Sequence, residues 1–388
     1  MTLIRRRSAG ALMAAAFGIF LMTVGFTERP VAAQGAAGAN EQKMEDAFQN
    51  IKSYRGQPAD HLIPTMVYFE AALGVGCPYC HDNDAAKREL DTKPQKDTAR
   101  RMIEMVSALN KNSFGGAPRV TCFTCHAGRP MPIGMPNVVG QPQGPPPLGE
   151  EYFANLPPAP AVPNTDAGQV LDRYIAAAGG AAAVQKTPSL VANGTMTQRR
   201  IGRPFPAQLV EISSKAPGMQ LIATRAGQAD NLLAYGPAGR WAKAGNGAPR
   251  DLRRGEGDAT VLEDAFNLPA QIKTILMEPR MDRPEIVMGR ELNVVRGRTP
   301  NLPLVKLYFE KESGLLRRIV YNQESSAGPY PTQVDYSDFR DVGGRKVPHI
   351  WVISQVRNRE FTWAMQNVRA VAVEDSKFAR PPAATAAR

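Results

Sequence analysis

The sequence is poor in cysteine and histidine, with four of each among 388 residues. All four cysteines lie in two copies of one pentapeptide, CPYCH at residues 77–81 and CFTCH at residues 122–126, so no thiol is left for any other role. The sequence also lacks an arginine- or lysine-rich cluster interleaved with aromatic residues. The formal net charge of +11 therefore indicates a solvated basic surface, suited to an acidic redox partner or an anionic membrane surface, rather than a nucleic-acid site.

The spacing within each pentapeptide suits covalent attachment of haem. Two thiols separated by two residues can each bond to one vinyl group of the same porphyrin, and the histidine that follows can then bind the iron. The sequence therefore predicts two covalently bound haem c groups. The expected attachment residues are Cys77, Cys80, Cys122 and Cys125, and the expected proximal iron ligands are His81 and His126.

The sequence gives less support to three other roles for the cysteines. Zinc ribbons usually separate their Cys-x-x-Cys pairs by roughly 15 to 20 residues, whereas 41 residues lie between Cys80 and Cys122. A thioredoxin-like pair does not require a histidine directly after it. Structural disulfides remain an alternative in an exported chain. Only haem attachment uses the histidine of both motifs.

The N-terminus has the pattern of a secretory signal peptide, which we expect over residues 1–33. Three arginines at positions 5–7 precede an apolar stretch of 16 residues, 11–26, and a small-residue cleavage site follows at residues 31–33. Because a membrane-spanning helix needs about 20 apolar residues, cleavage is favoured over a permanent anchor. We therefore expect a periplasmic protein, with membrane association as the alternative.

Each iron needs a second axial ligand, and methionine is the expected donor because a thioether favours ferrous iron relative to a second imidazole. Residues 60–73 and 94–110 have the apolar pattern and flanking glycines of helices that precede the two motifs. Met66 lies on the first helix and Met102 on the second, and Met105 is the alternative one turn further along.

Ligation of both irons by two histidines would have to use His61 and His349, the two histidines outside the motifs. His61 precedes Met66 by one and a half helical turns and should face elsewhere. We expect it to have a capping or solvated role. We expect His349, on a presumed strand beside a proline, to be structural.

The runs ARRMIEM at residues 99–105, VTCFTCHAG at 120–128 and TMV at 65–67 resemble one diheme half of the cytochrome c subunit of photosynthetic reaction centres. This resemblance implies that the helix before each haem supplies the distal methionine, at Met66 and Met102. It also implies a membrane-bound reaction-centre or electron-transfer complex as partner.

The chain departs from that family in three respects. The subunit that serves a reaction centre has four haems in two such halves, whereas this chain has one half. The histidine that the subunit uses for a haem of its other half has no counterpart between Lys111 and Arg119, and no cysteine lies near the signal for lipid attachment.

A proline-rich linker is predicted over residues 136–163, because proline fixes its backbone angle and lacks the N–H that helices and sheets need. It separates a small, mostly helical diheme cytochrome c domain at residues 40–135 from a second domain at residues 164–388. After a helix near residues 167–178, the second domain has many short strand patterns and a tight hairpin at residues 311–314. One or two helices with many strands predict an antiparallel β half-barrel around a packed helix, so the fold class is α+β.

The second domain resembles the periplasmic lipoprotein-carrier and sorting-protein superfamily. The likeness is carried by LYFE at residues 307–310 with GLL at 314–316, and by DYSDFR at 335–340 with GGRKVP at 343–348. It implies an open half-barrel whose apolar groove holds acyl chains, which makes lipid or quinone contact a candidate role. The alternative is a docking module whose groove is filled by its own side chains. This domain has no Ser/His/Asp set, carboxylate pair or phosphate-binding loop.

These features predict an electron-transfer protein that passes single electrons between membrane or periplasmic partners and transforms no substrate. One rival is a diheme peroxidase-type enzyme, which needs an iron with an open or displaceable sixth position. Another is a lipid or quinone carrier whose haems sense redox state. A photosynthetic role follows only from the resemblance.

Overall fold

The computed structural model of the protein describes residues 42–84, 87–132, 160–200, 203–237, 239–356 and 359–381. The expected signal peptide, the first two and last three residues of the expected haem domain, and residues 136–159 of the expected linker lie outside the described residues. The proposed domain boundaries therefore stay predictions. The described residues all belong to one compact unit.

The N-terminal part of the described chain is helical. Its elements are α1 (Met44–Ala47), the 3₁₀ turn η1 (Ala59–His61), α2 (Leu62–Leu73), the 3₁₀ turn η2 (Cys77–Tyr79), α3 (Pro94–Phe114) and α4 (Cys122–His126). Both predicted helices are confirmed. The first begins with the single turn η1 and continues as α2, and the second, α3, extends beyond its expected end at residue 110.

Glycine ends α2 and also allows it to approach the second motif. Gly74 follows α2 with φ 66°, a left-handed conformation that glycine adopts without steric cost. A Cβ atom at this position would collide with the carbonyl oxygen of Gly128, which lies just after the second motif. The Gly128 N–H donates to the Ala72 carbonyl at 2.9 Å. The end of α2 and the second motif therefore pack backbone against backbone.

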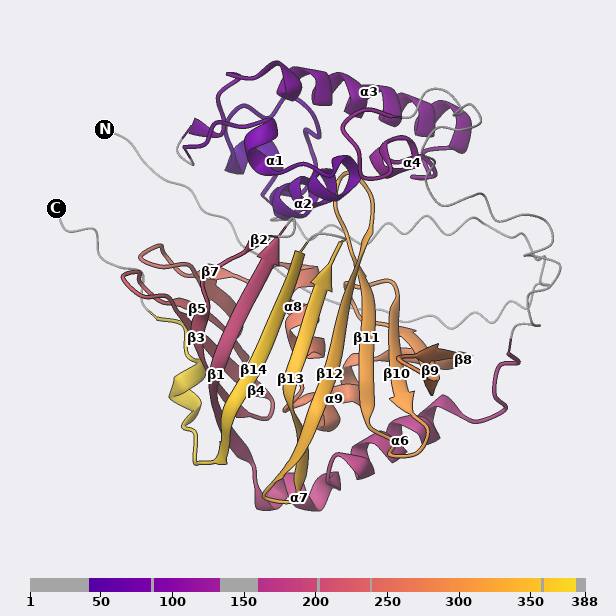
Figure 1. Cartoon of the computed structure of the whole chain (residues 1–388), viewed down its shortest axis with the longest axis vertical. Coiled ribbons are helices and arrows are strands. Elements are labelled where there is room, and N and C mark those ends of the chain that lie inside the picture. Colours follow the sequence, from indigo (N-terminus) through magenta and orange to yellow (C-terminus); the bar gives the residue numbers. More distant parts are fainter. Residues whose placement is uncertain are drawn as a thin grey trace, which may run out of the picture. The chain divides into compact units, whose positions relative to one another are not determined.

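Beyond residue 160, the described chain forms a single antiparallel sheet with open edges. Its strands are β1 (Ser189–Arg200), β2 (Arg203–Pro204), β3 (Gln208–Lys215), β4 (Gly218–Thr224), β5 (Asn231–Gly236), β6 (Gly239–Lys243), β7 (Arg250–Asp251), β8 (Met277–Val287), β9 (Arg290–Arg298), β10 (Val305–Glu310), β11 (Leu316–Gln323), β12 (Tyr330–Val342), β13 (Arg345–Gln355) and β14 (Arg359–Ala370). Across the described residues their spatial order is β7-β6-β5-β4-β3-β1-β14-β13-β12-β11-β10-β9-β8, and β2 pairs with β1 (Figure 1). The predicted hairpin joins β10 to β11.

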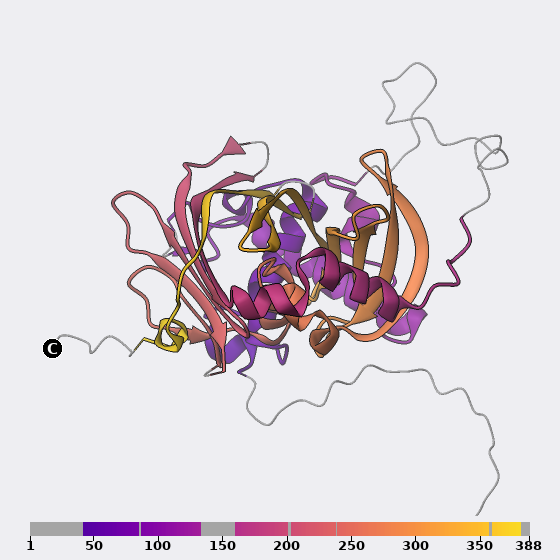
Figure 2. The same ribbon diagram turned by 90° about the horizontal axis from the view of Figure 1, so that it is seen from below.

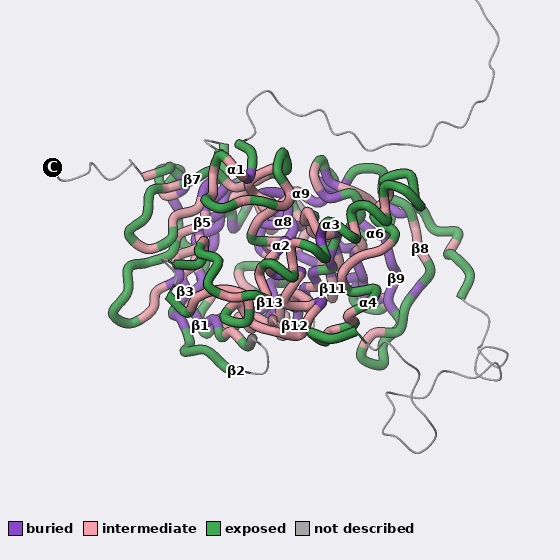
Figure 3. The backbone as a smooth tube through the Cα atoms, turned by 90° about the horizontal axis from the view of Figure 1, so that it is seen from above, coloured by how far each residue is buried: buried purple, intermediate pink, exposed green. Residues whose placement is uncertain are grey.

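Helices pack on the inner face of this sheet. They are α6 (Ala167–Ala177), α7 (Gly180–Lys186), α8 (Arg254–Glu263) and α9 (Leu268–Ile275), and the 3₁₀ turn η4 (Asp375–Phe378) follows the last strand. The sheet curves around them (Figure 2), and buried residues gather between strands and helices (Figure 3). Leu171, Leu262 and Ile272 share one core with inward side chains of the strands. The α+β half-barrel with a packed helix is thus confirmed.

The helices α8 and α9 were not predicted. The sequence of α8, RGEGDATVLE, contains two glycines, which weaken the helical signal. Its residues 257–262 are all buried. A helix buried on several sides lacks the alternation of apolar and polar faces by which periodicity identifies helices.

Glu263, the last residue of α8, places a half-buried carboxyl group beside this core. The Tyr321 hydroxyl donates a hydrogen bond to the Glu263 carboxyl, and the Tyr336 hydroxyl donates to the Glu263 backbone carbonyl at 3.3 Å. Burial raises the pKa of Glu263 from 4.5 to about 7, and the bond from Tyr321 offsets this only in part. The folded protein therefore binds this proton more tightly than the unfolded chain does.

We predict that Glu263 lowers stability as the pH rises. Because its pKa is higher in the folded state, the free energy of unfolding should fall between pH 4.5 and about 7 and then level off. The effect is at most about 3 kcal/mol. In Glu263→Gln this loss is absent, so the variant should gain stability over the parent across that window. Denaturant unfolding at a series of pH values measures the difference, with the exposed Glu312→Gln as control. A pH-independent difference would contradict the prediction.

Candidate haem-binding sites

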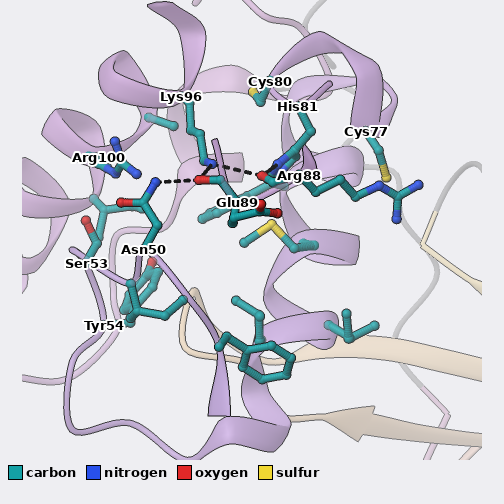
Figure 4. Close-up of a pocket in the computed structure, with 18 of the residues that line it drawn as sticks. Asn50, Ser53, Tyr54, Cys77, Cys80, His81, Arg88, Glu89, Lys96 and Arg100 are labelled. Atoms are coloured by element: carbon teal, nitrogen blue, oxygen red, sulfur yellow. Dashed lines mark hydrogen bonds between the residues drawn. The ribbon is translucent and has the colours of Figure 1, made fainter. Parts of the chain in front are cut away.

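The first motif lies in the wall of a cavity. Cys77 begins the turn η2, and Cys80 and His81 follow it directly, so one short stretch of backbone carries all three side chains. They line a cavity of about 700 Å³ (Figure 4). Met66 of α2 lines the same cavity. Apolar residues complete much of the wall, among them Phe48, Ile51, Leu62, Val67, Leu73 and Ile103. Volume and lining are those of a cofactor site.

Both motif histidines are held by a backbone carbonyl. Nδ1 of His81 lies 2.7 Å from the Arg88 carbonyl oxygen, and Nδ1 of His126 lies 2.9 Å from that of Arg129. Because a carbonyl oxygen can only accept, each Nδ1 carries the proton and each Nε2 keeps its lone pair. Metal-binding histidines are usually oriented in this way. Both rings are therefore in the tautomer that can bind iron through Nε2.

The first cavity has an excess of positive charge. Its described lining includes the cationic residues Lys52, Arg88, Lys96, Arg100 and Arg359, and the acidic residues Glu70 and Glu89. Glu70 is already engaged: it accepts from Cys77 Sγ at 3.4 Å and from Arg359 at 3.3 Å. A haem brings two propionate carboxylates, which unbalanced cations would stabilise. The thiols, the histidine, the thioether, the apolar wall and the cations therefore all fit a haem.

Two of the motif thiols differ from the reactive thiol of a thioredoxin-like pair. Burial raises the pKa of the Cys80 and Cys122 thiols, whereas the reactive cysteine of a thioredoxin-like pair has a lowered pKa. The structure pairs none of the four cysteines in a disulfide. Within the ranges that the structure describes, no three His, Cys, Asp or Glu side chains gather as a metal site.

The second motif forms the helix α4, which contacts both α2 and α3. Thr121 and Thr124 form a capping box at its start. The Asn110 side chain binds both backbone groups of Val120, donating to its carbonyl at 2.7 Å and accepting from its N–H at 2.9 Å. These bonds attach the segment before Cys122 to the end of α3. Cys122 also packs beside the buried cluster of α2.

The helix α3 has two distinct faces. The face toward the first cavity carries Lys96, Ala99, Arg100 and Ile103. A second face carries Met102, Met105 and Leu109, which also recur at helical spacing and are exposed. Met102 is 36% exposed and Met105 is 50% exposed. Both candidate ligands thus lie on the same side of α3, and neither lines the first cavity.

The structure brings Cys77, Cys80, His81 and Met66 together around one cavity. It places the second set on two helices in contact, with Cys122, Cys125 and His126 on α4 and Met102 on α3.

The two remaining histidines lie outside the first cavity. The ring of His349 is buried and bonds to the Val347 carbonyl at 3.2 Å, as a structural residue does. The capping role considered for His61 is not observed, because its side chain makes no cap hydrogen bond.

The sequence analysis missed Glu70, Lys96 and Arg359. Glu70 lies one helical turn after Met66, so helical spacing could have identified it. Arg359 is 289 positions from Glu70, and no local pattern could have joined them. Lys96 binds backbone carbonyls of the loop at residues 88–90, and no helix or strand periodicity relates the lysine to that loop.

Comparison with known proteins agrees with the motif analysis. Residues 22–161 match the family model described as photosynthetic reaction centre cytochrome C subunit. The chain is 30% identical to the photosynthetic reaction center cytochrome c subunit of Thermochromatium tepidum over 153 residues, which are 36% of this chain and 37% of that protein. It is 41% identical to cytochrome c-554 of Chloroflexus aurantiacus over 97 residues, 24% of this chain and 20% of that protein. The chain therefore spans less than two fifths of the length of these relatives.

Among solved structures, a LolA superfamily protein from Nitrosomonas europaea covers 55% of this chain and 98% of its own, with a TM-score of 0.40 and 10% identity. At that score the likeness carries no functional conclusion. No helix among the described residues is long and apolar enough to span a bilayer. The resemblance predicted from the haem motifs is confirmed by the family match: residues 22–161 are similar to the cytochrome c subunit of photosynthetic reaction centres.

Proposed function

We propose that this protein is an exported diheme c-type cytochrome that transfers single electrons. The observation that carries the proposal is the cavity in which both cysteines of the first motif, Met66 and the iron-binding tautomer of His81 meet. A haem c bound there supplies a one-electron Fe(II)/Fe(III) couple. Cys77 and Cys80 hold it covalently, His81 and Met66 bind its iron, and the apolar wall excludes water.

The second haem is proposed at α4, with Cys122 and Cys125 as attachment residues and His126 and Met102 as iron ligands. The carbonyl bond at His126 repeats the arrangement of the first motif. The exposed apolar face of α3 supports this proposal, because a haem there would cover it. The two haems would then lie on two faces of one helix, whose diameter is roughly 10 Å. Such an arrangement would bring both redox groups close together.

We propose that cleavage after residue 33 leaves the protein in the periplasm, with membrane association as the alternative. Its partners are then redox proteins, and the match to reaction-centre subunits favours a membrane-bound electron-transfer or reaction-centre complex and a photosynthetic role. We do not propose lipid or quinone binding in the sheet domain. The inner face of its sheet is packed against the apolar side chains of α6, α8 and α9.

The number of haems is tested by intact-protein mass after expression with a cytochrome c maturation system. The expected mass is that of residues 34–388 plus two haems. Replacing Cys77 and Cys80 by serine, or Cys122 and Cys125 by serine, should each remove one haem and leave the other. The parent chain produced without maturation factors is the control. A parent mass equal to the bare polypeptide would contradict the proposed function.

The distal ligands are tested by optical spectroscopy of Met66→Ala and Met102→Ala. Each variant should lose about half of the methionine-to-iron charge-transfer band, because each removes one thioether ligand. Met105→Ala is the matched control, since Met105 lies on the same face of α3 as Met102 and should leave the band unchanged. If Met105→Ala loses the band and Met102→Ala keeps it, Met105 is the ligand. A parent protein with a high-spin haem that binds peroxide would indicate the peroxidase-type enzyme instead.

A further inference from the structure

The backbone carbonyl that holds His81 also accepts a hydrogen bond from a cation. Nζ of Lys96 lies 2.9 Å from the Arg88 carbonyl oxygen, and Nδ1 of His81 lies 2.7 Å from the same atom (Figure 4). A carbonyl oxygen has two lone pairs, so both donors can bind at once. One peptide group therefore links a lysine ammonium to the proximal histidine of the first site.

Lys96 is firmly held in this position. Its ammonium also donates to the carbonyls of Glu89 and Leu90, at 2.8 and 3.0 Å, and pairs with Asp91 at 3.5 Å. Only 14% of its side chain is exposed, so water screens its charge weakly. Three consecutive carbonyls thus surround one ammonium group.

Asp91, which pairs with the Lys96 ammonium, also binds two other cations. It binds Lys52 at 2.7 Å and Arg100 at 2.8 Å. Hydrogen bonds from Arg100 and Lys52 hold the pKa of Asp91 well below its usual range. This carboxylate is therefore shared among several cations and neutralises the Lys96 ammonium only in part.

A cation on the carbonyl weakens it as an acceptor for His81. The positive charge draws electron density from the oxygen, so the Nδ1–H of His81 is polarised less than it would be by a free carbonyl. The imidazole then keeps less anionic character and donates less strongly through Nε2. A weaker proximal donor stabilises ferric iron less, which raises the reduction potential.

We propose that Lys96 is a positioning residue that raises the reduction potential of the first haem through the Arg88 carbonyl and His81. This inference rests on the proposed function, since it requires a haem at the first motif. Lys96 contacts the Arg88 carbonyl and not the Arg129 carbonyl that holds His126. Its effect therefore belongs to the first haem, and the second haem is an internal reference.

The test is a redox titration of the full, matured chain with Lys96→Met and Lys96→Gln. At a fixed solution potential near the parent midpoint, Lys96→Met should lower the ratio of reduced to oxidised first haem about tenfold. For a one-electron couple this corresponds to a midpoint potential lower by about 59 mV. Lys96→Gln keeps a neutral donor and should give a smaller shift in the same direction. The second haem should keep its potential in both variants.

Lys52→Met is the matched control. It removes a cation that lines the same cavity and binds the same Asp91, but Lys52 bonds to the Asp91 carboxylate rather than to the Arg88 carbonyl. Its shift should be less than half that of Lys96→Met. An equal shift in Lys52→Met would show a general charge effect and overturn the proposal, as would an unchanged or raised potential in both Lys96 variants.

A purely structural role for Lys96 is distinguished by NMR of the ¹⁵N-labelled His81 ring. If the proposal holds, the His81 Nδ1 proton stays protected from exchange with solvent in Lys96→Met. Its resonance then shifts in the direction expected for a stronger hydrogen bond. Rapid exchange of this proton would show that the loop has opened, which overturns the proposal. The intact mass distinguishes a failure of the proposed role of Lys96 from a failure of the proposed function. Two haems with an unshifted potential refute only the role of Lys96, whereas a parent chain without haem refutes the proposed function.

Discussion

To hold a haem c, as proposed, a Cys-x-x-Cys-His motif must present two sulfur atoms and one imidazole nitrogen to a single porphyrin, and this constraint accounts for the arrangement of the N-terminal part of the protein. A short helical turn brings the two sulfur atoms together, since cysteines three positions apart lie on one side of a turn. The turn does not orient the imidazole. The carbonyls of Arg88 and Arg129 do so, each from a loop that follows its motif. The residues after each motif are therefore as important to the site as the motif itself.

The sheet domain supports the helix that carries Met66. Tyr330 of β12 shares a buried cluster with Val67 and Tyr68 of α2. The backbone N–H of Ser326 donates to the Thr65 hydroxyl at 2.9 Å, directly beside Met66 in sequence. Arg359 of β14 binds Glu70 one turn further along α2. Strands and loops from the C-terminal half thus support the wall of the first cavity.

The inner face of the sheet is covered by helices that belong to the same part of the chain. This face is apolar, and α6, α8 and α9 cover it with residues such as Leu171, Leu262 and Ile272. Some of the buried polar groups within this layer pair with one another. Asp264, between α8 and α9, accepts from the Tyr235 hydroxyl at 2.6 Å and from the Asn267 side chain at 2.9 Å. The side chains of α6, α8 and α9 therefore fill the inner face of the half-barrel.

The sequence alone determined the two motif sites, the helices before them, the antiparallel sheet and the hairpin of residues 311–314. These features depend on local chemistry: thiol spacing, helix periodicity and turn residues act within a few positions. Only the tertiary structure decided that Met66 lines the cavity of the first motif, that Arg359 reaches Glu70, and that α8 and α9 fill the sheet. Such contacts join residues far apart in the chain, and their energy comes from burial and hydrogen bonding that exist only once the chain has folded.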